Sequence, residues 1–201
     1  MRIRKAEKMI CTLLRRANVH QLKLIIFCSL FVISEALPSL GLATTFYADP
    51  NNGKMAYDGL APEWNGTHGP WKTLQEVFEN GKIGNPVRPG DTILLRAGYH
   101  GEIVYSNAHN SDYITIQAQP GHNPGLRRIE SHNASKWIFR GLTISPELAP
   151  IYKPNTFVHI GSGCNHIVIE HCNIYSVQDA SEWDTDDWAS LRDSARYAIE
   201  I

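Results

Sequence analysis

The amino-acid sequence predicts an all-β protein, and more narrowly a parallel β-solenoid made of short strands. Two observations carry this prediction. After position 91, apolar and polar side chains alternate along short segments, and no amphipathic helices intervene between these segments. The segments also recur at intervals of roughly 20–30 residues, which is typical of solenoids, whereas an α/β fold needs helices of about 10–15 residues between its strands. A β-sandwich is the remaining alternative, although its strands need not repeat in register.

The first 43 residues have the composition of a secretory signal peptide. Seven Lys and Arg residues precede an apolar run over residues 24–33, and small residues follow at 41–43. A basic leader, an apolar run of about ten residues and a small-residue exit are typical of such signals. A membrane anchor, the alternative, needs about 20 apolar residues. We expect cleavage after Ala43, a secreted (extracellular or periplasmic) protein, and no stable membrane span after cleavage.

The rest of the chain divides into an entry segment, residues 44–91, and a series of coils, residues 92–201. In the entry segment, Thr73 and Glu76 have the spacing of a capping box, which satisfies free N–H groups at the start of a helix. We therefore expect one short helix over residues 73–80.

Two series of strands are expected in the coils. The first contains the apolar pairs Ile93/Leu95, Ile114/Ile116, Trp137/Phe139 and Ile167/Ile169. Superposing each pair on the next places Ile93, Ile114, Trp137 and Ile167 in one interior column. The second series runs between these strands and is centred on Ile103, Ile129, Val158 and Ile199. The step, meaning the number of residues from one strand of a series to the next, is longest between the last two.

The outward side chains differ between the two series. Successive side chains of a strand point to opposite faces, so each residue that follows an inward one points outward. The first series presents a mostly apolar row: Leu94, Thr115, Ile138 and Val168. The second series presents Glu130, His159 and Glu200, a ladder of ionisable groups.

Four segments resemble a known family. Residues 46–50 (FYADP), 69–75 (GPWKTLQ) and 89–100 (PGDTILLRAGYH) look like the entry segment of secreted right-handed parallel β-helix proteins, the pectin-lyase-like superfamily. Residues 136–144 (KWIFRGLTI) are similar to its usual coil sequence. The resemblance implies a right-handed β-helix whose N-terminal end is capped by the short helix.

The resemblance also implies further coils. Residues 197–201 match the start of a new coil and not a polar closing cap. An uncovered strand end exposes unpaired backbone groups. We therefore expect the chain to be incomplete at its C-terminus.

The net charge of the chain bears on which kinds of molecule it can bind. The formal net charge is −1, but residues 44–201 hold 12 basic and 18 acidic residues, a net charge of −6. Because nucleic-acid binding needs clustered positive charge, we exclude nucleic acid as a partner.

The outward ladder holds the candidate catalytic residues. His159 lies between two carboxylates, which favour its protonated form and suit acid–base work or carboxylate recognition. We take His159, Glu130 and the nearby Arg128 as candidate catalytic residues, and Glu200 as a candidate substrate-binding residue. The alternative is a solvated sheet face stabilised by pairing of charges between strands.

An acidic concentration near residue 180 is the candidate metal site. Asp184, Asp186 and Asp187 lie in the insertion that lengthens the last step of the second series. Ca²⁺ takes six to eight oxygen ligands, and several carboxylates close together suit it. Ca²⁺ is thus the cofactor that this cluster would bind; a solvated acidic loop is the alternative.

The remaining histidines and cysteines have no ligand spacing. We interpret six histidines as surface residues of turns or strand edges: His100, His109, His122, His132, His166 and His171. Cys172 falls at an inward position and is interpreted as a buried free thiol.

Two functions follow from the sequence. The first is a secreted β-helix that binds or acts on an acidic polysaccharide, with lyase or epimerase chemistry in the full-length protein. The second is a non-catalytic, adhesin-like or structural β-helix. We expect no lyase activity from this chain alone, because the last member of the ladder lies at the chain end.

Overall fold

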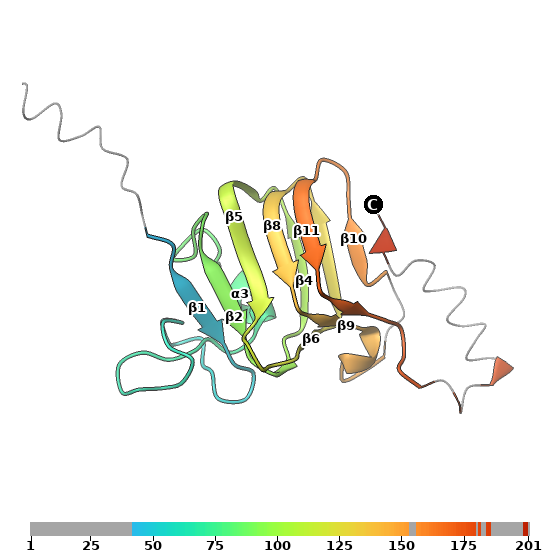
Figure 1. The fold of residues 1–201 in the computed structure, drawn as a ribbon, viewed down its shortest axis with the longest axis horizontal. Coiled ribbons are helices and arrows are strands. Elements are labelled where there is room, and N and C mark those ends of the chain that lie inside the picture. The colour runs from blue at the N-terminus through green and yellow to red at the C-terminus, as the bar shows by residue number, and fades with distance from the viewer. Residues whose placement is uncertain (1–41, 153–155, 180, 182–183, 186–198, 201) are drawn as a thin grey trace, which may run out of the picture. The chain divides into compact units, whose positions relative to one another are not determined.

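The computed structural model describes residues 42–152, 156–179, 181, 184–185 and 199–200. Within them the chain forms a β-solenoid of about three turns (Figure 1). Its stacked turns form three sheets, and all strand pairs in these sheets are parallel. The predicted parallel β-solenoid is therefore confirmed. No helix among the described residues is long and apolar enough to cross a membrane. The predicted signal segment lies outside the described residues, apart from its last two.

The first sheet has the strand order β1-β2-β5-β8-β11. Its strands are β1 (Thr45–Ala48), β2 (Thr92–Leu95), β5 (His109–Ala118), β8 (Ser135–Arg140) and β11 (Asn165–Glu170). Trp137 pairs with Ile114 on one side and with Ile167 on the other, as the superposed apolar pairs predict.

The predicted register between the first two coils is wrong. Ile93 pairs with Ile116 and not with Ile114, so the step is two residues longer. The predicted interior column therefore separates into two. A shift of two residues returns every side chain to the same face, so the apolar pattern cannot distinguish the two registers. The predicted outward row changes in the same way, because Leu94 pairs with Gln117 and Thr92 takes its place beside Thr115.

The second sheet has the order β13-β10-β7-β4. Its strands are β4 (Glu102–Ser106), β7 (Arg128–His132), β10 (Val158–Ile160) and β13 (Ile199–Glu200). Ile129 pairs with Ile103 and with Val158, and Val158 pairs with Ile199. All three predicted steps of this series, including the long last one, are confirmed.

The third sheet is built from strands of two or three residues, in the order β12-β9-β6-β3. They are β3 (Gly98–Tyr99), β6 (Pro124–Leu126), β9 (Thr143–Ile144) and β12 (Asn173–Ile174). A short 3-10 helix, η1 (Pro146–Leu148), follows β9. Successive coils thus add strands to the same three sheets, which close the stack around its interior.

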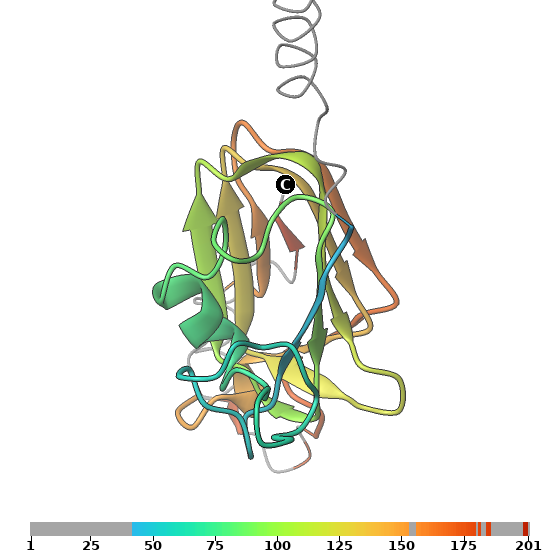
Figure 2. The same ribbon diagram turned by 90° about the vertical axis from the view of Figure 1, so that its left-hand side faces the viewer.

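The interior is filled mainly by the inward side chains of the three sheets, together with side chains of α3 (Leu74–Glu79) and of the segments between the strands. Viewed from the β1 end (Figure 2), the sheets surround a single core. Its largest fully buried side chains are Trp71, Trp137, Phe139, Leu74, Ile93, Leu95, Ile103, Ile114, Ile116, Leu126, Ile129 and Leu142. Burial of such apolar side chains stabilises the fold by about 1.5–3 kcal/mol each.

The predicted helix is present as α3 (Leu74–Glu79). The Thr73 hydroxyl accepts a hydrogen bond from the Glu76 N–H (3.2 Å) and donates one to the Glu76 carboxylate (2.8 Å). The helix packs beside β4, the end strand of its sheet. There the Gln75 side-chain oxygen accepts a hydrogen bond from the Glu102 N–H (3.1 Å), which satisfies a backbone group at the sheet edge.

Candidate functional site

The candidate site lies on the outer surface of β7 and β10. The buried residues are Ile129 and Ser131 in β7 and Val158 in β10. The intervening side chains point outward, and the register places Glu130 directly beside His159. The predicted juxtaposition of these two residues is therefore present.

Glu130 is the centre of the site. Its Oε1 atom lies 2.8 Å from His132 Nε2 and 3.9 Å from His159 Nδ1. Its Oε2 atom forms an ion pair with the guanidinium of Arg128. The rings of His132 and His159 meet edge to face, with centroids 5.0 Å apart. One carboxylate thus connects an arginine and two histidines from neighbouring coils.

The site is only partly open to water. The side chains of Glu130 and Arg128 are 15% and 18% exposed, whereas those of His159 and His132 are 29% and 40% exposed. Burial lowers the pKa of Arg128, and the nearby Glu102 carboxylate opposes that change. The carboxylate and the guanidinium therefore form the base of the site, and the two imidazoles form its accessible rim.

A second ion pair adjoins the first. Arg127 pairs with Glu102, and Glu102 is the backbone partner of Arg128 across β4 and β7. The two arginines and the two glutamates balance in formal charge. These four residues therefore carry no excess of positive charge.

The other predicted site residues are Glu200 and the acidic residues near position 180. The backbone of Glu200 pairs with that of His159, as the ladder predicts. Asp184 is exposed. Asp186 and Asp187 lie outside the described residues, so the predicted Ca²⁺ site stays a prediction.

The sequence prediction did not include His132 in the site, because it was interpreted as a surface residue of a turn or strand edge. It is the last residue of β7, two positions after Glu130 and therefore on the same face. A longer strand assignment would have found it, because the alternation of residues 128–132 continues to His132. Gly161 lies against its ring, since an added Cβ atom there would come within 2.2 Å of His132 Nδ1.

His100 was predicted to lie on the surface, and this is wrong. It is fully buried next to the start of α3. Its Nδ1 atom accepts a hydrogen bond from the Leu74 N–H (3.3 Å), and its Nε2–H donates to the Arg96 carbonyl (2.8 Å). Burial lowers the pKa of His100 to about 4. This histidine has a structural role, because it satisfies a free N–H group of the helix start.

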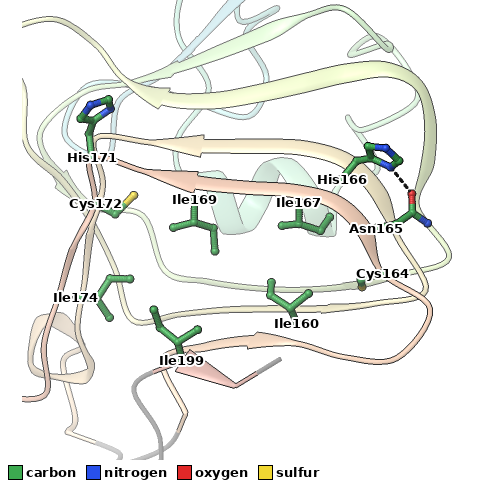
Figure 3. A pocket seen from close by; sticks show the side chains of 10 residues that line it. All are labelled: Ile160, Cys164, Asn165, His166, Ile167, Ile169, His171, Cys172, Ile174 and Ile199. Carbon is green, nitrogen blue, oxygen red and sulfur yellow. Dashed lines mark hydrogen bonds between the residues drawn. The ribbon is translucent and has the colours of Figure 1, made fainter.

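A separate apolar cavity of about 520 Å³ lies at the β11 end of the stack. Ile160, Ile167, Ile169, Ile174 and Ile199 surround it (Figure 3). Both described cysteines line it as well; they are free and half-buried, so the predicted free thiol at Cys172 is confirmed, although only partly buried. Apolar side chains dominate the lining, which does not suit a charged sugar.

Comparison with known proteins gives no relative. No family model, no curated protein and no solved structure matches this chain.

Proposed function

We propose that this chain is the β-solenoid of a secreted protein that binds an acidic polysaccharide on the outer surface of β4, β7 and β10. The observation that carries the proposal is the ladder of outward ionisable side chains, in which Arg128, Glu130 and His159 come from adjacent coils. The resemblance of the entry segment supports the same class of protein.

The finer description of the fold belongs to the same proposal. We place the chain in the pectin-lyase-like superfamily, as a right-handed β-helix with α3 as its N-terminal cap. The position of α3 supports this assignment, because the helix packs beside the end strand β4. The ring centroid of Phe78 lies 5.6 Å from that of Tyr105 and 5.7 Å from that of Trp137. The helix therefore contributes a side chain to the core.

An extended polymer fits the geometry of this surface. Neighbouring strands of a sheet lie about 4.8 Å apart, so a polymer crossing the strands meets a new row of side chains at each step. Arg127 and Arg128 offer guanidinium groups, which bind carboxylates and sulfates through paired hydrogen bonds. Rows of this kind suit a repeating anionic sugar better than a small ligand.

In a lyase or epimerase reaction, each residue of the site would have its own role. Such reactions need a base for the C5 proton of a uronate and a cation for its carboxylate. His159 has a partly exposed ring and would serve as the base, whereas Arg128 would neutralise the substrate carboxylate. Glu130 would act as a positioning residue, because both of its oxygens already contact side chains of the site. The predicted substrate-binding role of Glu200 is supported by its backbone pairing with His159.

One observation favours the non-catalytic alternative, an adhesin-like binding surface. The charge of Arg128 is already compensated by Glu130, so a substrate carboxylate has to compete for the guanidinium. Transition-state stabilisation requires groups that are free to act on developing charge. A binding surface has no such requirement. We therefore propose glycan binding as the main function of this surface, and glycan cleavage or epimerisation as an additional claim.

The test measures binding and turnover separately. The unmodified chain is titrated with oligosaccharides of pectate, alginate and a glycosaminoglycan, with neutral dextran as the control ligand. We expect one of the acidic glycans to bind, and binding to weaken as salt is added, because screening reduces the attraction between charges. Turnover is followed by the absorbance of unsaturated uronate, with and without Ca²⁺.

A matched pair of arginine variants locates the binding surface. Arg128→Gln should weaken glycan binding at least tenfold, whereas Arg140→Gln should leave it unchanged. Arg140 is a suitable control, because it also pairs with a glutamate, Glu170, but lies on the first sheet. Equal binding by the two variants, or no binding of any acidic glycan by the unmodified chain, would contradict the proposal.

A further inference from the structure

We propose that Glu130, His132 and His159 form a binding site for a Zn²⁺ ion. The inference rests on the positions of their ligand atoms and does not require glycan binding, but a His159 that binds Zn²⁺ could not also serve as the base of a lyase reaction. One oxygen of Glu130 and one ring nitrogen from each histidine all lie within 4.8 Å of one another. The three residues are half-buried and come from two adjacent strands, β7 and β10.

The separations match those of a nearly formed zinc site. Zn–N and Zn–O bonds are about 2.0–2.1 Å long, so the ligand atoms of a tetrahedral site lie about 3.4 Å apart. The Glu130 Oε1 atom lies 2.8 Å from one imidazole nitrogen and 3.9 Å from the other, on either side of that value. The two imidazole nitrogens lie within 4.8 Å of each other, so the rings have to rotate towards each other before all three ligands reach one ion.

The types of ligand select the class of metal. Two imidazoles and one carboxylate are a common set for Zn²⁺ and related transition ions, and three protein ligands leave a position for water or an anion. Ca²⁺ and Mg²⁺ prefer ligand sets made of oxygen atoms, and this site offers a single carboxylate. The site is thus distinct from the acidic cluster that the sequence suggested for Ca²⁺.

The surroundings of the site hold the carboxylate in position. Arg128 pairs with the Oε2 atom of Glu130 and leaves Oε1 directed to the histidines. Partners of this kind orient a metal ligand and affect its affinity. Gly161 contributes by the absence of a side chain, because a Cβ atom there would occupy the space of the His132 ring.

Zinc binding is measured by calorimetry on the metal-free chain without a histidine tag. We expect one Zn²⁺ per chain, and no comparable heat from Ca²⁺ or Mg²⁺. His159→Gln and Glu130→Gln should each weaken binding at least tenfold. His166→Asn is the matched control: His166 is exposed on β11, outside the cluster, and its positive φ of 55° is a conformation that asparagine adopts readily. It should bind Zn²⁺ as the unmodified chain does.

Gly161→Ala tests the geometry without removing a ligand. Its added methyl group should displace the ring of His132 and weaken zinc binding, while circular dichroism and thermal unfolding of the metal-free chain stay close to those of the unmodified protein. Retained zinc affinity in Gly161→Ala or in His159→Gln would overturn the proposal.

X-ray absorption of the zinc-loaded, unmodified chain gives a readout that needs no variant. We expect nitrogen and oxygen ligands at about 2.0–2.1 Å, including two imidazoles. A sulfur shell at about 2.3 Å would assign the metal to the cysteines and overturn the proposal. The absence of stoichiometric binding would overturn it as well.

Discussion

Strands β7 and β8 follow each other along the chain, and they use the same alternation for different purposes. Both bury every second side chain in the shared core. The outward side chains of β7 are Arg128, Glu130 and His132, whereas those of β8 are Lys136, Ile138 and Arg140. The inward residues thus determine the fold on both strands, and of these two strands β7 alone gathers its outward residues into a compact cluster of charged and imidazole groups.

The ion pairs of the two strands also differ in exposure. Arg128 and Glu130 are 18% and 15% exposed and pair within β7, whereas Arg140 and Glu170 are 46% and 33% exposed and pair between β8 and β11. An exposed pair contributes little to stability, because water solvates its charges when they are separated. A half-buried pair is costly to break, since the remaining charge loses its partner without regaining water.

The largest expected effect compares two isoleucines of these strands. Ile129 is fully buried in β7, and Ile138 points outward from β8. Ile129→Asp should abolish folding, because an unpaired buried charge costs several kcal/mol, close to the whole stability of a domain. Ile138→Asp should cost about 1 kcal/mol, the range of strand propensities. Chemical denaturation followed by circular dichroism measures both, and similar losses would contradict the inward and outward assignment.

The equivalent substitution at Ile167 should have a smaller effect than at Ile129. Ile167 was predicted to lie in the interior column, and it does pair with Trp137. However, it lines the cavity at the β11 end and is only partly buried. An aspartate there retains access to water, so Ile167→Asp should be less destabilising than Ile129→Asp in the same denaturation experiment.

The second-largest expected effect is a pH dependence of stability that the buried histidine, His100, causes. The pKa of His100 is about 4 in the folded chain, below its ordinary value of 6.5. The unfolded chain therefore binds the proton more tightly, and stability should be complete above pH 6.5 and fall as the pH decreases towards 4. The loss over this interval is about 3 kcal/mol, from about 1.4 kcal/mol for each pKa unit.

Denaturation at several pH values between 4.5 and 7 measures this dependence. His100→Asn should flatten it, because the titrating group is gone. The titration of His100 by nuclear magnetic resonance in the unmodified chain is a check that needs no variant. Protonation of His100 near pH 6.5 would contradict the buried assignment.

The fold was predictable from the sequence where the alternation of apolar and polar residues and the spacing between strands indicate the same register. The second series of strands has all its registers as predicted, which placed Glu130 beside His159 correctly. The step between the first two coils was wrong, because registers that differ by two residues bury the same faces.

The two errors in the histidines have different physical causes. His132 was interpreted as a surface residue of a turn or strand edge, although its spacing from Glu130 already fits one strand face. No local pattern marks His100 as buried, since nearby glycines suggest a turn. Its burial depends on α3, whose Leu74 N–H group it satisfies from a position far along the chain.

The smallest expected effect returns to the two ion pairs. Glu130→Gln should destabilise the chain by about 1–2 kcal/mol, because Arg128 keeps its charge in a half-buried position and loses its partner. Glu170→Gln should cost less than about 0.5 kcal/mol, since Arg140 remains solvated. Denaturation at low and high salt separates the two, because added salt screens the exposed pair more than the half-buried one. If Glu170→Gln proved as destabilising as Glu130→Gln, the outer surfaces of β7 and β8 would not differ in the way that their exposure indicates.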